Sequence, residues 1–155
     1  MTVEPLDRIL AEIPLFHGMK EEHLALIAGC ASNVRFEAGE FAAHHGEPAD
    51  QFLVLRQGRM ALEIHAPGRD TVTIQTLGEN EVLGWSWLLP PHEWHFDARA
   101  LTLTRALKLD GRCLRGKFER DPELGYEMMR RFAQVIVRRL EAMGLQLLDV
   151  YGNHS

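Results

Sequence analysis

The chain has 155 residues, 46% of them hydrophobic and 25% charged, a composition ordinary for one globular domain and unlike that of a disordered chain. Its formal net charge of -5 argues against a nucleic-acid-binding surface as the main function, because such surfaces are basic. The apolar runs are too short to span a bilayer, and the acidic N-terminal stretch does not resemble a secretory signal. We therefore expect a cytoplasmic protein without a membrane or nucleic-acid partner.

The first thirty residues are predicted to be helical. Apolar residues recur every three or four positions over 6–13, which is the spacing of an amphipathic helix. Pro14 ends that segment, and the same pattern returns over 20–31. Glu21 and Glu22 at the start of the second segment suit a helix N-terminus, where the helix dipole favours negative charge.

From residue 33 the period changes to that of short strands. Eight runs rich in β-branched and aromatic residues follow, and glycines punctuate them about ten positions apart. This pattern indicates an antiparallel sandwich or barrel. The runs are 33–36, 40–44, 51–55, 60–65, 71–77, 81–85, 96–101 and 105–109, and the glycines are Gly39, Gly46, Gly58, Gly68, Gly78 and Gly84.

The helical period returns after Asp110. Residues 111–120 form a short helix candidate, and Asp121 followed by Pro122 is typical of the start of another helix. The pattern continues to residue 151, with an apolar stripe of Met129, Phe132, Ile136, Leu140, Met143, Leu147 and Tyr151 flanked by Arg130, Arg131, Arg138 and Arg139. The fold class is therefore α+β: an antiparallel β-roll between N-terminal helices and a long C-terminal helix.

Catalytic and metal-binding motifs do not stand out. The sequence has no G-x-S-x-G, P-loop or H-E-x-x-H, so we expect no enzyme and no metal site. The histidine pairs at 44–45 and 92/95 are interpreted as solvated or hydrogen-bonded. Cys30 and Cys113 lie far apart in no CxxC pattern, and we interpret them as free buried thiols of a reducing compartment.

A specific resemblance lies in residues 39–64, GEFAAHHGEPADQFLVLRQGRMALEI. The stretch resembles the front half of the cyclic-nucleotide-binding domain of the catabolite-activator and kinase-regulator type. The positions in register are Gly39, Glu40, Gly46, Glu47, Pro48, Ala49, Asp50, Phe52 and Gly58. The resemblance covers roughly residues 5–151. It implies a single domain over 1–155, with N-terminal helices over 1–32, a jelly-roll type β-roll over 33–110 and C-terminal helices over 111–151.

The resemblance also implies a phosphate-binding cassette over residues 84–101. In the family a glutamate of this cassette binds the ribose and an arginine pairs with the cyclic phosphate. Gly84 and the end at 99–101 match, but Trp85 stands at the glutamate position and Trp94 at the arginine position. An indole ring is uncharged and only donates, and a charge-assisted hydrogen bond contributes about 1.5–3 kcal/mol. We therefore expect weak cyclic AMP binding.

Three interpretations of the altered cassette stay open. It is retuned for another small anionic or planar ligand, or its rings fill the old pocket and the domain is an interaction module, or backbone amides alone still bind a cyclic nucleotide. No cofactor is required by any of them. A cavity beside residues 84–97 would favour the first interpretation, in which the domain senses a small ligand. The candidate ligand residues are Gly84, Trp85, Ser86, Trp87, Trp94, His95, Phe96 and Asp97.

The long helix is the second functional candidate. In the resembling family this element pairs with its two-fold mate, so we expect a homodimer. We expect no DNA-binding domain, because nothing in the chain resembles the helix-turn-helix that follows in those regulators. Output would then pass through a protein partner, without nucleic-acid binding by this chain alone. The dimer-helix candidates are Phe132, Ile136, Leu140, Met143 and Leu147.

Overall fold

The computed structural model describes residues 5–65 and 67–152, with side chains described through residue 142. All eight predicted strands are present and the predicted fold class is confirmed. The N-terminal helices are α1 (Leu6–Glu12), the 3-10 turn η1 (Pro14–Phe16) and α2 (Glu21–Ala28). The strands are β1 (Ala31–Phe36), β2 (Phe41–Ala43), β3 (Gln51–Gln57), β4 (Met60–Ile64), β5 (Val72–Leu77), β6 (Val82–Leu83), β7 (Asp97–Ala100) and β8 (Thr104–Asp110). The C-terminal helices are α3 (Gly111–Arg120) and α4 (Pro122–Gly152).

The strands form two antiparallel sheets, one ordered β1-β8-β3-β6 and the other β2-β7-β4-β5. One hydrophobic core lies between the sheets, and a second lies between the first sheet and the helices. Strand β3 serves both cores: Leu53 and Leu55 belong to the first, and Phe52 and Val54 belong to the second. Successive strand residues point to opposite faces, which explains why β3 is apolar without alternation.

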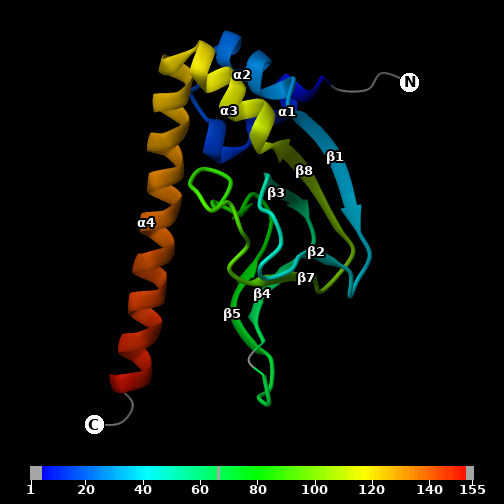
Figure 1. Cartoon of the computed structure of the whole chain (residues 1–155), viewed down its shortest axis with the longest axis vertical. Helices are drawn as coiled ribbons and strands as arrows, with labels where there is room; N and C mark the ends of the chain where they lie inside the picture. The colour runs from blue at the N-terminus through cyan, green and yellow to red at the C-terminus, as the bar shows by residue number, and fades with distance from the viewer. Residues whose placement is uncertain (1–4, 66, 153–155) are drawn as a thin grey trace.

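Helices α3 and α4 begin at side-chain caps. A carboxylate oxygen of Asp110 accepts from the backbone N–H groups of Arg112 and Cys113 at 3.0 and 3.1 Å. Asp121 accepts from the N–H of Leu124 at 3.2 Å, as the Asp-Pro pair predicts. Figure 1 shows that α4 then runs along one side of the β-roll, with the loop between β6 and β7 beside it.

The inner face of α4 differs from the predicted stripe. Phe132 is 1% exposed and packs in the helix-side core with Leu124 and Met128, so it does not lie on an outer surface. Leu140 is 62% exposed, and Met129 and Val137 are exposed as well. The predicted residues Met143 and Leu147 have side chains outside the described residues. Within the part of the chain that the structure describes, no helix is long and apolar enough to cross a membrane.

The free-thiol prediction is wrong, because Cys30 and Cys113 form a disulfide. Strand β1 pairs with β8 in the register Ala31 to Leu109, and the N–H of Asp110 donates to the carbonyl of Cys30 at 2.9 Å. The residue before β1 therefore lies beside the first turn of α3, although 83 positions separate the cysteines. Sequence spacing contains no information on this pairing.

Candidate ligand site at the cassette and the long helix

Trp87 anchors the cassette loop to both C-terminal helices. Its side chain is 0% exposed. The ring stacks on Phe52 at a centroid distance of 5.0 Å and meets Phe132 edge-on at 5.2 Å, with Phe118 at 6.1 Å. The guanidinium of Arg115 donates to the Trp87 carbonyl. The loop is thus packed into α3 and α4, and this ring is core and not a free ligand surface.

Trp94 and Phe96 point into the other core, between the two sheets. Gly84 makes room for Trp94. A Cβ atom at Gly84 would lie 2.7 Å from Cη2 of Trp94, and Gly84 adopts φ +102°, a conformation that costs little only for glycine. The glycine that matches the cassette pattern therefore seats an indole ring here.

Replacing Gly84 with alanine should destabilise the fold by about 1–3 kcal/mol, because the methyl group meets Trp94 in a strained backbone conformation. Urea unfolding of the purified chain measures this loss. Gly78→Ala is the matched control, since Gly78 has an ordinary φ and its nearest neighbouring atom is an oxygen of Glu81 at 3.9 Å. Equal losses for the two variants would contradict the assigned role of Gly84.

Trp85 lies between the two cores and is half-buried. It meets Phe96 edge-on at 5.6 Å. Over its ring stands the guanidinium of Arg139 from α4, 5.1 Å from the ring centroid, within the range of a cation–π interaction. At the position where the resembling family has its ribose-binding glutamate, this chain therefore has a tryptophan whose ring contacts an arginine of the long helix.

Arg139 is an unusual charge, because it is only 8% exposed. Its Nη1 atom is buried and has no hydrogen-bond partner among the described residues. Burial lowers the pKa of Arg139 to about 10, and the charge of Glu81 opposes that shift. The group is still protonated at neutral pH, and it is a cation with an unused donor.

The remaining cassette candidates are not brought together with the rings. His95 is exposed and Ser86 is half-buried. Asp97 points away from the roll interior, because side chains alternate along β7 and Ala98 points inward. Asp97 accepts from the N–H of His45 at 2.8 Å and lines a second pocket on the outer face of the sheet.

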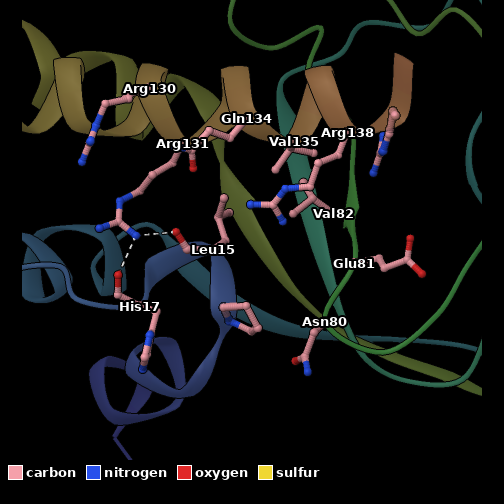
Figure 2. Close-up of a pocket in the computed structure, with 12 residues that line it drawn as sticks. Leu15, His17, Asn80, Glu81, Val82, Arg130, Arg131, Gln134, Val135 and Arg138 are labelled. Atoms are coloured by element: carbon pink, nitrogen blue, oxygen red, sulfur yellow. Dashed lines mark hydrogen bonds between the residues drawn. The ribbon is translucent and has the colours of Figure 1, made fainter. Parts of the chain in front are cut away.

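A pocket of about 400 Å³ lies between α4, the η1 segment and the turn before β6. Figure 2 shows Arg131 and Arg138 reaching from α4 toward the opposite wall, which carries Leu15, His17, Asn80 and Glu81. None of the cassette candidates lines it. The lining residues are Pro14, Leu15, His17, Asn80, Glu81, Val82, Arg130, Arg131, Gln134, Val135, Arg138 and Arg139.

These arginines were not predicted as a site, although the sequence contains a signal for them. Two Arg-Arg pairs, at 130–131 and 138–139, are eight residues apart. Arg131 and Arg138 are seven residues apart, about two helical turns, so these two arginines lie on one face of the helix. Which face that is could not be known before Phe132 and Met128 were seen to point inward.

The chain is a β-roll whose cassette loop packs against a long C-terminal helix. Residues 33–121 match the cyclic nucleotide-binding domain family, and the chain belongs to that family, as the motif at residues 39–58 predicted. A CRP-like cAMP-activated global transcriptional regulator of Mycobacterium tuberculosis is 26% identical over 146 residues. The match covers 94% of this chain and 63% of that relative, so the chain spans less than two thirds of its length.

Solved structures share the fold. A cyclic nucleotide-binding domain from Methylobacillus flagellatus has a TM-score of 0.79 at 18% identity, covering 94% of this chain and 82% of that one. The catabolite activator protein of Thermus thermophilus has a TM-score of 0.70 at 24% identity, covering 90% of this chain and 63% of that one. Both likenesses support the fold of this chain.

Proposed function

We propose that residues 1–155 form a single regulatory domain that senses a small ligand and transmits its presence to α4. The observation that carries this proposal is the packing of Trp87 against Phe132 and Phe118. A cassette loop that shares a core with two helices cannot shift without repacking them. Ligand binding would then select one of two packings, as in a population shift. The domain requires no cofactor and catalyses no reaction.

The ligand differs from that of a cassette with its usual residues. Trp94 replaces the arginine expected at its position and is buried, so it offers no charge to a phosphate. Trp85 replaces the expected glutamate and has a guanidinium over its ring. We propose that cyclic AMP binds weakly through the cassette, and that the physiological ligand is another small anionic or planar compound.

Intrinsic fluorescence tests the sensor proposal, because all three tryptophans lie within residues 85–94. The chain is titrated with cyclic AMP, cyclic GMP, a cyclic dinucleotide, ATP and adenosine. A saturable change in emission with any of these compounds supports sensing. A flat response to every compound, with emission already blue-shifted, would contradict it.

The second candidate function is an interaction module whose ring-filled cassette is structural. The burial of Trp87, Trp94 and Phe96 favours it. A flat fluorescence titration together with a retained protein partner would support this function over the first.

We propose a homodimer in which the exposed face of α4 meets a second copy. The apolar positions on that face, spaced alternately by three and four, are Tyr126, Met129, Ala133, Ile136 and Leu140, of which only Ile136 is half-buried. This is the heptad spacing of a coiled-coil seam. The seam excludes Phe132 of the original prediction, which faces the roll, and keeps Ile136 and Leu140. Regulatory output would pass to a protein partner, and the chain would bind no nucleic acid by itself.

Leu140→Glu should convert the dimer into a monomer at tens of micromolar, because it places a charge from each copy within the apolar seam. Sedimentation equilibrium measures the change. Leu89→Glu is the matched control, since Leu89 is 64% exposed and lies in the cassette loop and not on α4. A wild-type monomer, or a dimer that survives Leu140→Glu, would contradict the proposal.

We also propose a cytoplasmic location. The Cys30–Cys113 disulfide argues against it, because disulfides are rare in reducing compartments. Counting free thiols in rapidly quenched cells tests it. Two reactive thiols per chain under denaturing conditions would support the cytoplasm. A fully bonded Cys30–Cys113 pair would point to an oxidising compartment.

A further inference from the structure

The pocket between α4, η1 and β6 concentrates positive charge in an acidic protein. Four guanidinium groups and one carboxylate, that of Glu81, line it, whereas the whole chain has a net charge of -5. A cleft lined by charges of one sign attracts counter-ions of the other sign. The charge of the pocket is therefore opposite to that of the protein around it.

Two of the four arginines already have partners. Arg131 donates to the carbonyl oxygens of Leu15 and His17 at 2.7 and 2.9 Å and to Glu127 at 2.9 Å. Arg130 donates to the same carboxylate at 2.8 Å. The two bonds from Arg131 to the Leu15 and His17 carbonyls fasten the η1 segment to α4, as the dashed lines in Figure 2 show, whereas the contacts with Glu127 lie within the helix. They build the pocket wall and leave little donor capacity for a ligand.

Arg139 is in the opposite situation. It lines the pocket, is more than nine-tenths buried, and has a buried Nη1 without a partner among the described residues. A buried charge without a hydrogen-bonding counter-charge is costly. Trp85 offers only the face of its ring, and a ring face accepts no strong hydrogen bond. An oxyanion entering the pocket would supply the missing acceptor.

Apolar side chains also line the pocket: Val135 on α4, and Leu15 and Val82 on the segments facing it (Figure 2). A volume of about 400 Å³ lies in the range of sites for small organic molecules and exceeds what one inorganic ion needs. A ligand with an anionic end and a carbon body matches this combination of guanidinium groups and apolar side chains. Guanidinium groups bind phosphate through paired N–H donors, which a point charge cannot reproduce.

We propose that this pocket binds a small organic phosphate, with its phosphoryl group on Arg139 and Arg138 and its carbon body against Leu15, Val82 and Val135. The inference rests on the proposed sensing function and moves the anion site from the cassette to the long helix. Because Arg139 also lies over Trp85, a bound phosphate would act on the cassette loop and on α4 at the same contact.

Calorimetric titration of the full chain tests the proposal. The probes are cyclic AMP, AMP, glucose 6-phosphate and inorganic phosphate, and the uncharged controls are adenosine and glucose. At least one ester should bind more tightly than inorganic phosphate, and its affinity should fall with added salt. Arg139→Met should weaken that ester by about tenfold to a hundredfold, the loss expected for charge-assisted hydrogen bonds.

Two further variants keep the result interpretable. Arg138→Met changes an exposed residue, so it should fold normally and also weaken the ester. Arg35→Met is the control, because Arg35 lies on β1, pairs with Glu37 and is absent from the pocket lining. Arg35→Met should bind the ester with the affinity of the wild type.

The contradicting outcomes separate the two proposals. If no ester binds, or if Arg139→Met and Arg138→Met bind as the wild type does, the pocket assignment is overturned. Sensing then still stands when the tryptophan emission responds to some compound. If inorganic phosphate binds as tightly as every ester, the organic-phosphate class is wrong. If no compound binds and the emission never changes, both proposals fall.

Discussion

Trp87→Ala should destabilise the protein by about 3–5 kcal/mol, the range measured for removal of a large buried aromatic side chain. The ring is fully buried and touches Phe52, Phe118 and Phe132 from three different elements. Its removal leaves a cavity where β3, α3 and α4 meet. In a domain of this size the midpoint of thermal unfolding should fall by roughly 6–20 °C.

Urea unfolding followed by circular dichroism measures this effect. Trp85→Ala is the comparison, because Trp85 is half-buried and its truncation should cost clearly less. Trp87→Ala should also uncouple the cassette loop from α4, so any ligand response in the helix should be lost. A loss of stability below about 1 kcal/mol would show that Trp87 does not anchor the loop.

Removing the disulfide should have the second-largest effect. A crosslink that closes a loop of this length contributes about 2–5 kcal/mol by restricting the unfolded chain. Cys30 and Cys113 join the end of the α2 segment to the first turn of α3. Oxidised wild-type protein should therefore unfold at higher urea concentration than the Cys30→Ser/Cys113→Ser double variant.

A reducing agent supplies the control for this experiment. It should lower the wild-type midpoint to near that of the double variant and leave the double variant unchanged. If reduction has no effect on the wild type, the disulfide does not contribute to stability. A rapid thiol count before unfolding confirms that the starting protein is oxidised.

Much of the fold was predictable because local signals agreed with the tertiary structure. Glycine punctuation and β-branched runs located all eight strands, and the Asp121-Pro122 pair located the start of α4. Gly84 was predicted to be a residue of the cassette from its match to the family motif. The sequence could not show that it seats the Trp94 ring, since that contact joins the two ends of the cassette loop.

The features that the sequence did not predict depend on which faces of the helices and strands pack together. Phe132 fits either face of an amphipathic pattern, and only its contact with Phe52 shows that it points inward. The cysteine pairing depends on the register of β1 against β8. The arginine pocket needs α4, η1 and β6 together, and no local pattern reports on three separate segments.

We infer that the phosphate site has moved from the cassette to the long helix. A crystal structure of the protein with the phosphate ester that binds most tightly tests this directly. We expect the phosphoryl group within hydrogen-bonding distance of the Arg139 guanidinium, with Trp87 and Trp94 still buried. A phosphoryl group on the backbone amides beside Gly84, with Trp85 or Trp94 displaced from its core, would contradict it.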